Sequence, residues 1–208
     1  MSKVKIFYFD ARGLAEPSRL ILHFANIEFE DIRINNEEWP AIKSTTKTGK
    51  IPYLEFDGHL IVESYAMHRF LARKYGLAGK DEFEQAKVDG IADIAKDFYK
   101  SVAPWMYALL GYVPGNHVEL KQQHLCESIE IFLPIFSNFL KESNSGFLVE
   151  SGLTWADFVL SEFLITLVKL EPTILDENYS DLKEYIQRIQ NVSQLKNYYS
   201  TRKFAKVN

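Results

Sequence analysis

The sequence predicts an α/β domain followed by an all-helical domain. Before about residue 76, short β-rich runs alternate with helical patterns in the order β-α-β-α-β-β-α. From Glu82 onward the β signal disappears, and apolar residues recur at the three- and four-residue spacings of packed helices. We therefore expect residues 1–76 to form the first domain, residues 77–81 a linker, and residues 82–208 the helical domain.

The first domain opens with a β-rich run at residues 3–9, and Tyr8 lies near its carboxyl end. A helix with Pro17 in its first turn follows, and then a second strand at residues 29–34. Two strands joined through a helix are expected to pair in parallel with a right-handed crossover. Ligands of α/β sheets bind at the carboxyl ends of such strands, so Tyr8 is a candidate site residue.

The stretch from Lys50 to Ala72 is the most informative part of this domain, and it follows a polar, irregular segment at residues 35–49. It contains, in order, a corner at Ile51-Pro52, a strand at Tyr53–Phe56, an Asp57-Gly58 turn, a strand at Leu60–Val62 and a helix with Ser64 as its N-cap. The N–H groups that open a helix lack intrahelical partners and carry partial positive charge. The corner and the helix start therefore suit a peptide-like ligand that carries a carboxylate.

The second domain is expected to be all-helical. The predicted helices lie at residues 82–102, around residues 125–140 with a bend at Pro134, from Thr154 to Leu170, at residues 182–189 and at residues 195–203. The strongest local signal is the spacing of Thr154 and Asp157, which is that of a capping box.

Composition excludes several classes of protein. The 208 residues are 47% hydrophobic, which is enough for a sizeable core, and the formal charge of −4 comes with scattered Lys and Arg. Nucleic acid and membrane are therefore not expected as partners. The single cysteine, Cys126, cannot form an internal disulfide, and no apolar run is long enough for a signal peptide or a membrane span. We expect a cytoplasmic protein, and the five histidines show no metal-ligand spacing.

Each candidate site residue also has a purely structural interpretation. Tyr8 could be a core tyrosine, Trp39 a loop residue that covers the sheet, Lys43 and Lys50 solvated charges, Ser64 only a helix cap, and Asp97 part of an exposed charged face. Taken singly, none of these residues decides the function.

The order and spacing of the motifs are more specific than the single residues. The motifs are Phe-Tyr-Phe around Tyr8, Arg12-Gly13, Glu16-Pro17-Ser18-Arg19, Trp39-Pro40-Ala41-Ile42-Lys43, Gly49-Lys50-Ile51-Pro52, Glu63-Ser64 and Thr154-Trp155-Ala156-Asp157-Phe158. Together they resemble the cytosolic glutathione S-transferases over essentially the whole chain. The most similar class is sigma, which includes nematode transferases and the haematopoietic prostaglandin D synthase. The resemblance implies a thioredoxin-like N-terminal domain, a helical C-terminal domain and a homodimer.

The resemblance also implies roles for individual residues. The glutathione site would comprise Tyr8, Trp39, Lys43, Gly49, Lys50, Ile51, Pro52, Glu63 and Ser64, with Asp97 contributed by the partner subunit. Tyr8 would donate a hydrogen bond to the sulfur, Lys43 would meet the glycyl carboxylate, and Ser64 would bind the γ-glutamyl carboxylate. The Ile51 backbone would pair with the cysteinyl residue, which implies a cis Ile51-Pro52 bond. A small hydrophobic electrophile would bind between the domains, near Gly13, Leu14 and Trp105.

Three positions depart from the pattern of the class. Glu63 replaces a usual Gln, Leu14 replaces an arginine of the vertebrate prostaglandin synthase, and Lys96 interrupts the acidic cluster that binds a divalent ion there. The leading hypothesis is therefore a detoxifying transferase that conjugates glutathione, its co-substrate, to small hydrophobic electrophiles without a metal. A non-catalytic carrier of haem or other apolar ligands is the alternative. A prostaglandin D synthase-type isomerase ranks lower, because Leu14 and Lys96 oppose it.

Overall fold

The computed structural model describes residues 3–175 and 177–202, which group into two compact units. Unit 1 comprises the chain up to Leu77 together with the segment that begins at Asn191. Unit 2 runs from Ala78 to Gln190. Each unit is described here by itself.

Unit 1 contains a mixed four-stranded sheet with the order β2-β1-β3-β4. The strands are β1 (Val4–Phe9), β2 (Glu30–Ile34), β3 (Tyr53–Phe56) and β4 (His59–Val62). β1 pairs in parallel with β2 and antiparallel with β3, and β3 pairs antiparallel with β4. The predicted parallel pair and the predicted hairpin are both confirmed.

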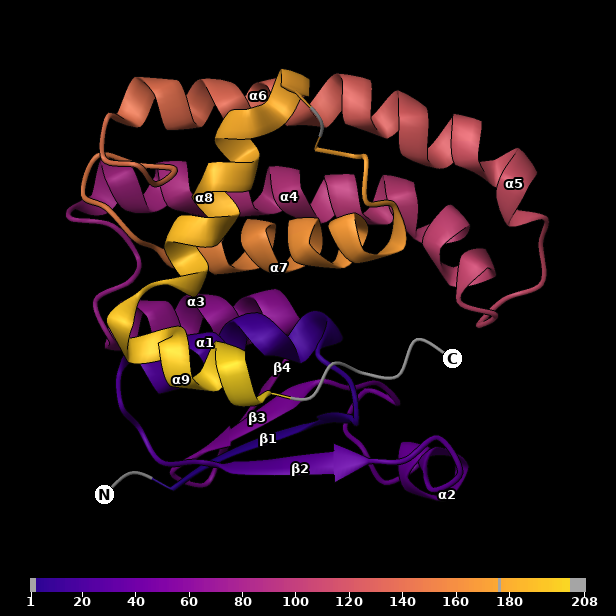
Figure 1. Ribbon diagram of the computed structural model, residues 1–208. Coiled ribbons are helices and arrows are strands. Elements are labelled where there is room, and N and C mark those ends of the chain that lie inside the picture. Colours follow the sequence, from indigo (N-terminus) through magenta and orange to yellow (C-terminus); the bar gives the residue numbers. More distant parts are fainter. Residues whose placement is uncertain (1–2, 176, 203–208) are drawn as a thin grey trace. The chain divides into compact units, whose positions relative to one another are not determined.

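Helices complete unit 1, and α1 and α3 cover one face of its sheet (Figure 1). They are α1 (Glu16–Phe24), α2 (Trp39–Lys43), α3 (Ser64–Lys74) and α9 (Ser193–Thr201). α1 packs against α3 on one side and against α9 on the other. Ile6, Leu20, Leu54 and Leu71 are fully buried, so the core lies between the sheet and these helices. The packing leaves the carboxyl end of β1 next to the start of α1.

The short helix α2 occupies the place that the predicted order β-α-β-α-β-β-α gives to a helix, within a segment that is polar and irregular in sequence. Pro40 lies in its first turn, where a proline costs no backbone hydrogen bond. The start of α3 differs from the prediction by one residue. Ser64 was expected to cap α3 but is its first helical residue. Glu63 holds the cap position, and its carbonyl accepts the first intrahelical hydrogen bond from Met67 N–H at 3.1 Å.

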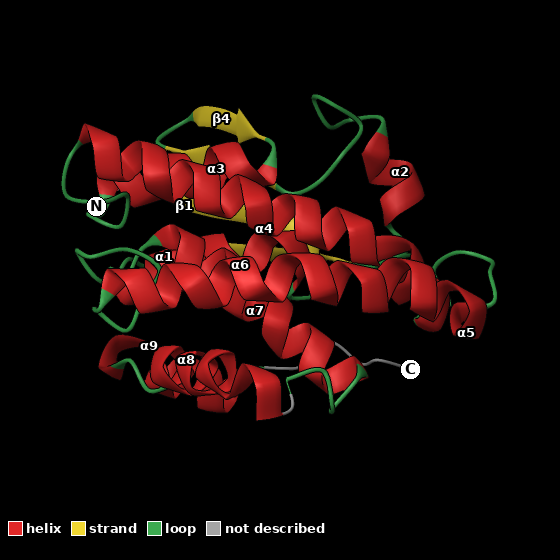
Figure 2. Cartoon of the chain, turned by 90° about the horizontal axis from the view of Figure 1, so that it is seen from above, coloured by secondary structure: helices red, strands yellow, loops and turns green. Residues whose placement is uncertain are grey.

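Unit 2 is all-helical, as predicted. It contains α4 (Glu82–Leu109), α5 (His117–Leu120), a π-helical turn (Lys121–Cys126), α6 (Glu127–Ser143), α7 (Trp155–Leu170), a 3₁₀ turn (Glu177–Tyr179) and α8 (Ser180–Gln190). α4, α6 and α7 run along one another (Figure 2), and α8 crosses α6 and α7 (Figure 1). Among the described residues, no helix is both long and apolar enough to cross a bilayer.

The predicted end of the first long helix was wrong. α4 was expected to stop near Val102, but it continues through Pro104 to Leu109. A proline removes one helical hydrogen bond, and burial of Trp105 and Met106 immediately after it favours continuation of the helix. Packing therefore outweighs the local signal at this point.

The last helix belongs to a different unit from the one the sequence suggested. Residues 82–208 were assigned to the helical domain, but α9 groups with unit 1. Its Tyr198 ring stacks on His23 of α1 with ring centroids 4.0 Å apart, and Leu195 is fully buried. The expected end of this helix, Lys203, lies outside the described residues.

The predicted capping box at the start of α7 is confirmed. The carboxylate of Asp157 accepts hydrogen bonds from Thr154 N–H at 2.7 Å, Thr154 Oγ1 at 2.8 Å, Leu148 N–H at 3.0 Å and Tyr185 Oη at 3.1 Å. Asp157 is fully buried, and burial raises its pKa to about 6 even though these hydrogen bonds oppose the shift. One carboxylate thus joins the start of α7 to the preceding loop and to α8.

Candidate active site

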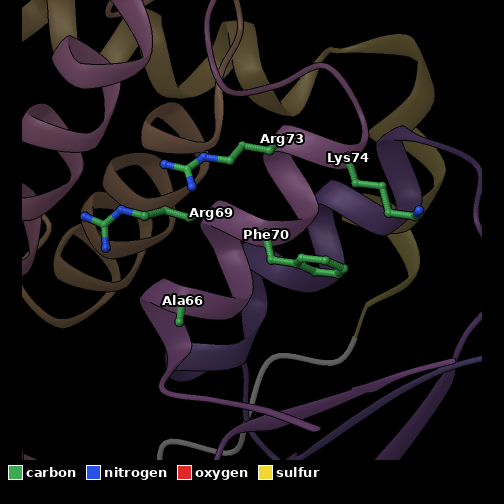
Figure 3. Close-up of a pocket in the computed structure, with 5 residues that line it drawn as sticks. All are labelled: Ala66, Arg69, Phe70, Arg73 and Lys74. Atoms are coloured by element: carbon green, nitrogen blue, oxygen red, sulfur yellow. The ribbon is translucent and has the colours of Figure 1, made fainter. Parts of the chain in front are cut away.

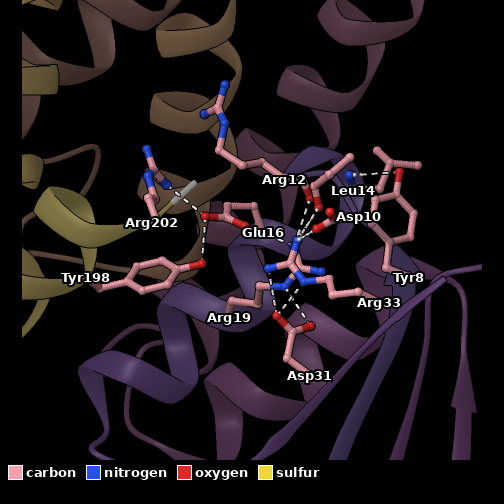
Figure 4. Close-up of polar contacts among 11 residues, drawn as sticks. Tyr8, Asp10, Arg12, Leu14, Glu16, Arg19, Asp31, Arg33, Tyr198 and Arg202 are labelled. Carbon is pink, nitrogen blue, oxygen red and sulfur yellow. Dashed lines mark hydrogen bonds and ion pairs between the residues drawn. The ribbon is translucent and has the colours of Figure 1, made fainter. Parts of the chain in front are cut away.

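Tyr8 lies at the carboxyl end of β1, where strand alternation turns its side chain to the buried face of the sheet. Its Oη accepts a hydrogen bond from Leu14 N–H at 3.3 Å (Figure 4). This bond uses a lone pair of the hydroxyl oxygen and not its proton. The guanidinium carbon of Arg19 lies 6.0 Å from the centroid of the Tyr8 ring. The hydroxyl is therefore held at the edge of a loop that connects β1 to α1.

Gly13 in this loop allows the Tyr8 hydroxyl to lie where it does. The glycine has a φ of +42°, which a side chain disfavours, and a β-carbon there would lie 2.7 Å from Tyr8 Oη and 2.9 Å from Tyr8 Cε1. Such distances are closer than van der Waals contact. The absence of a side chain at Gly13 therefore lets the loop approach the hydroxyl edge of Tyr8 closely.

Arg19 holds the same loop from inside the unit. Its side chain is fully buried, and its Nη1 donates to the carbonyls of Ala11 at 2.9 Å and Arg12 at 3.1 Å. Nη1 also donates to Glu16 Oε2 at 3.0 Å, and Nε donates to Asp31 Oδ1 at 3.1 Å. The planar guanidinium therefore links the loop to α1 and β2.

Glu16 is a second buried charge, and it connects α1 to the segment that carries α9. Its Oε1 accepts from Tyr198 Oη at 2.9 Å and from Arg202 Nη1 at 2.8 Å, while its Oε2 accepts from Arg19 (Figure 4). Burial alone would raise the pKa of Glu16, but the charges of Arg19 and Arg202 and these hydrogen bonds hold it below its usual value. Glu16 is therefore a carboxylate at neutral pH.

His68 of α3 contacts the loop from another side. One ring nitrogen, Nδ1, lies 2.8 Å from Ser18 Oγ, and the ring also hydrogen-bonds to the backbone of Leu14. Complete burial, and secondarily the charge of Arg69, lower the pKa of His68 to about 3. His68 is therefore neutral at physiological pH and can hold Leu14 without adding a charge beside Tyr8.

α2 and the residues after it bring three of the predicted binding residues together. Trp39 opens the helix and meets the ring of Phe9 edge-on, with centroids 5.5 Å apart. Lys43 closes the helix and is exposed, and its Cε lies 4.0 Å from the position of a β-carbon on Gly49. Lys50 is exposed as well. Trp39 thus has the structural role of covering the sheet, and it also stands beside a cationic surface.

The Ile51-Pro52 bond is cis, as the resemblance implied. Glu63, before α3, has a φ of 69° and a ψ of 120°. Within the described part of the chain, the other non-glycine residues with positive φ are Asn or Asp, which tolerate such values well. A glutamate in this conformation is costly, and such positions cluster at functional sites. The positive φ of Glu63 therefore motivates a binding role for the start of α3.

Two further predicted residues lie on α4. Asp97 is exposed, with 67% of its side chain accessible, and it pairs with Lys100 at 3.5 Å. Trp105 is buried, with 2% of its surface accessible. In the described residues, no group of acidic, histidine and cysteine side chains is placed to hold a metal ion.

Sequence reasoning did not assign a role to the buried polar groups behind Tyr8. Glu16 and Arg19 were noted only as part of a motif, and His68, Tyr198 and Arg202 were not considered as site residues. One signal was available, because Glu16 precedes Leu20 by four residues and therefore shares its apolar helix face. A charge on such a face needs a buried partner.

Comparison with known proteins agrees with this organisation. Residues 4–73 match the model of the glutathione S-transferase N-terminal domain, and residues 96–202 match that of the C-terminal domain. The chain is 37% identical to glutathione S-transferase 1 of Ascaris suum, over 97% of this chain and 98% of the relative. The monomeric Na-GST-3 of the hookworm Necator americanus is 39% identical, with a TM-score of 0.92 and coverage of 98% of this chain and 99% of that one. A Nu-class enzyme of Haemonchus contortus is 35% identical, with a TM-score of 0.90 and coverage of 99% and 100%.

A thioredoxin-like unit with a mixed four-stranded sheet, followed by an all-helical unit, defines the class of protein as a glutathione-dependent transferase. The chain belongs to the glutathione S-transferase family and is an enzyme of that family.

Proposed function

We propose that this transferase conjugates the thiolate of glutathione to small hydrophobic electrophiles, and that Tyr8 stabilises the thiolate. The observation that carries the proposal is the placement of the Tyr8 hydroxyl. It lies at the carboxyl end of β1, it accepts a hydrogen bond from Leu14 N–H, and Gly13, which carries no side chain, lies close beside it. A thiolate on that side would receive the hydroxyl proton in a hydrogen bond.

The size of the effect is sufficient for catalysis. A free thiol has a pKa of about 8.5, so only a few per cent is thiolate at neutral pH. A hydrogen bond to a charged acceptor contributes about 1.5–3 kcal/mol, which lowers the thiol pKa by about one to two units. The thiolate would then be a major species at neutral pH.

The remaining glutathione contacts are proposed on unit 1. Trp39 and Lys43 would hold the glycyl end, and the lysine would meet its carboxylate. Gly49, Lys50, Ile51 and Pro52 would face the cysteinyl backbone. Ser64 and the first turn of α3 would bind the γ-glutamyl carboxylate, because helix N-termini favour anions. Glu63 would then lie near the γ-glutamyl ammonium group.

The test is the substitution Tyr8→Phe, with Tyr53→Phe on β3 as the matched loss of a hydroxyl from the same sheet. We expect Tyr8→Phe to lower kcat/KM for an aryl halide about tenfold to a hundredfold below neutral pH, in proportion to the lost thiolate. The acid limb of the pH profile should move up by about one to two units. Wild-type conjugation by purified Tyr8→Phe protein would show that the catalytic assignment is wrong.

The same protein preparation separates the enzyme from a non-catalytic carrier. Glutathione calorimetry with a parallel turnover assay should give both heat and product. Binding of haem or another apolar ligand without any glutathione heat would favour the carrier.

The electrophile is proposed to bind near Gly13, Leu14 and Trp105. Prostaglandin D synthesis is not favoured, because Leu14 and Lys96 replace the groups that the resemblance associates with it.

The class and the cellular role are also proposals. The motif pattern supports the sigma class, although one similar solved structure is described as Nu-class. Detoxification in the cytoplasm is consistent with the single cysteine and with the absence of a long basic block in the sequence.

We further infer a homodimer in which Asp97 reaches the glutathione of the partner subunit. α4 carries Asp93, Lys96, Asp97 and Lys100 on or beside one face, and such a partly polar face suits a self-complementary contact. On α3, Arg69 and Arg73 line a pocket together with Ala66, Phe70 and Lys74 (Figure 3). One hookworm relative is described as monomeric, so the assembly needs its own experiment.

That experiment combines sedimentation with glutathione binding. We expect a dimer at micromolar concentration, and Asp97→Ala should weaken glutathione binding by about 1–3 kcal/mol. The control is Glu82→Ala, which removes an exposed carboxylate from the same helix. Asp81 is not used as the control, because its side chain caps the start of α4. A fully active species of monomer mass would contradict both the dimer and the role of Asp97.

A further inference from the structure

The segment that carries α9 is connected to the Tyr8 hydroxyl through a series of buried and part-buried hydrogen bonds and the backbone of one loop (Figure 4). Tyr198 and Arg202 bind Glu16, Glu16 binds Arg19, and Arg19 binds the carbonyls of Ala11 and Arg12. The same loop continues to Leu14, whose N–H donates to Tyr8 Oη at 3.3 Å. The series therefore ends at the group that we propose to be catalytic.

Geometry makes Glu16 dependent on both of its partner segments. Arg19 approaches Oε2, whereas Tyr198 and Arg202 approach Oε1, so each carboxylate oxygen is held by a different element. The side chains of Glu16 and Arg202 are only 1% and 3% exposed, so water cannot replace a lost partner easily. Loss of the contacts to Oε1 would leave a buried carboxylate that rotates toward Arg19.

Such a rotation would reach the loop because a single nitrogen serves three acceptors. Arg19 Nη1 donates to Glu16 and to both loop carbonyls, at 2.9 to 3.1 Å. A guanidinium group is rigid and planar, so a shift of one contact changes the other two. Gly13 lies between these carbonyls and Leu14, and it passes so close to Tyr8 that a β-carbon on it would lie 2.7 Å from Tyr8 Oη.

We propose that Tyr198 and Arg202 are positioning residues for the transferase reaction, because they hold Glu16 and thereby fix the loop that orients the Tyr8 hydroxyl. This inference rests on the proposed role of Tyr8. It assigns part of the catalytic machinery of unit 1 to a segment that follows unit 2 in the sequence.

Other charged groups near this series enter the interpretation of any pH effect. Glu16 faces Arg19, Arg202, the hydroxyl of Tyr198 and the ring of His23, and Arg19 also faces Asp31 and the Tyr8 ring. His23 is partly buried, and burial lowers its pKa although Glu16 opposes the shift. A His23→Gln variant therefore identifies any contribution of that ring to the profile.

The experiment uses the full chain and compares four single-substitution variants with the wild type. Tyr198→Phe removes one hydroxyl and keeps the ring that stacks on His23. Arg202→Gln removes a charge, and Arg202→Lys retains a cationic donor. Lys196→Gln is the matched control, because it removes an exposed positive charge from α9, the helix that carries Tyr198.

We expect Tyr198→Phe and Arg202→Gln each to move the acid limb of the kcat/KM profile upward by about half to one pH unit, that is, about threefold to tenfold in activity below neutral pH. This is less than the about hundredfold loss that a misplacement of 1 Å can cause. Arg202→Lys should recover most of the wild-type profile, and Lys196→Gln should match it. In a Tyr8→Phe background, Arg202→Gln should cause no further shift, because the two act through one group.

The outcomes separate the inference from the proposed function. If Tyr8→Phe has the wild-type profile, the role of Tyr8 is wrong and the inference falls with it. If Tyr8→Phe is shifted but Tyr198→Phe and Arg202→Gln are not, the inference alone is overturned, and α9 only stabilises unit 1. A lower temperature of unfolding without a shifted profile would count in the same way, since a purely structural role predicts it.

Discussion

Among the described residues, Glu16 in unit 1 and Asp157 in unit 2 are fully buried carboxylates at the start of a helix, and the two behave in opposite ways. Glu16 opens α1 and contacts two arginines and a tyrosine. Asp157, in the first turn of α7, accepts hydrogen bonds from neutral donors, which include the hydroxyl of Tyr185. Burial raises the pKa of Asp157 to about 6, whereas the pKa of Glu16 lies below its usual value.

The difference lies in the partners and not in the degree of burial. Both side chains have lost their water, which by itself raises the pKa of a carboxyl group. Four neutral hydrogen bonds to Asp157 offset part of that effect, and cations beside Glu16 outweigh it. Unit 1 is therefore organised around an ionic cluster, and unit 2 around a polar network whose central group takes up a proton in mild acid.

Removal of the centre of the ionic cluster should have the largest effect. We expect Glu16→Ala to lower the free energy of unfolding by about 3–5 kcal/mol, because it leaves buried guanidinium groups without their carboxylate. Urea denaturation followed by circular dichroism measures the change. Glu30→Ala on β2 is the control, since that carboxylate is 61% exposed and pairs with Lys5 at the surface. A loss no larger than the control's would show that Asp31 and the loop carbonyls suffice for Arg19.

The pH dependence of unit 2 should be the next largest effect. The folded-state pKa of Asp157 is about 6 and its reference value is 3.8, so the folded state holds the proton more tightly. The stability from this group is fully present below the reference value and is lost as pH rises through about 6, a change of about 3 kcal/mol.

Asp157→Asn should remove this slope while Glu16 leaves one of opposite sign. Because the pKa of Glu16 is lowered, its contribution is present above the reference value of 4.5 and is lost as pH falls through the folded value. Urea titrations of wild type and Asp157→Asn across mild acid provide the measurement. A wild-type slope in Asp157→Asn would mean that Asp157 stays ionised throughout.

A matched pair of tyrosines gives the smallest and most direct test. Tyr198→Phe removes a donor to Glu16, and Tyr185→Phe removes a donor to Asp157. About one pH unit below the pKa of Asp157, we expect Tyr198→Phe to cost about 1.5–3 kcal/mol and Tyr185→Phe about 0.5–1.5 kcal/mol, as for charged and neutral acceptors. Equal costs in thermal or urea unfolding at that pH would remove the distinction between the two centres.

The parts of the fold that local sequence signals specify were predictable. The Asp57-Gly58 hairpin and the Thr154–Asp157 capping box both depend on residues a few positions apart, and both were found where expected. The partnership of α9 was not predictable, because Tyr198 and Glu16 are 182 residues apart in the sequence. A helical pattern indicates which face is buried but not which element covers it.

The candidate site divides in the same way. The residue pattern predicted that Tyr8 lies near the carboxyl end of the first strand and that a helix starts at Ser64, and the structure places both there. The close approach of Gly13 to Tyr8 and the positive φ of Glu63 depend on tertiary geometry, which no spacing of residue types encodes. The continuation of α4 past Pro104 likewise depends on packing that outweighs a local helix-breaking signal.

The placement of α9 has a consequence for the order in which the protein is made. Unit 1 is discontinuous, because α9 is translated only after residues 78–190, which belong to unit 2. A nascent chain that has emerged up to Leu77 therefore contains Glu16 and Arg19 but not Tyr198 or Arg202. Domains commonly fold as units during synthesis, from the N-terminus onward. In this chain the ionic cluster of the first unit can close only after the second unit has been synthesised.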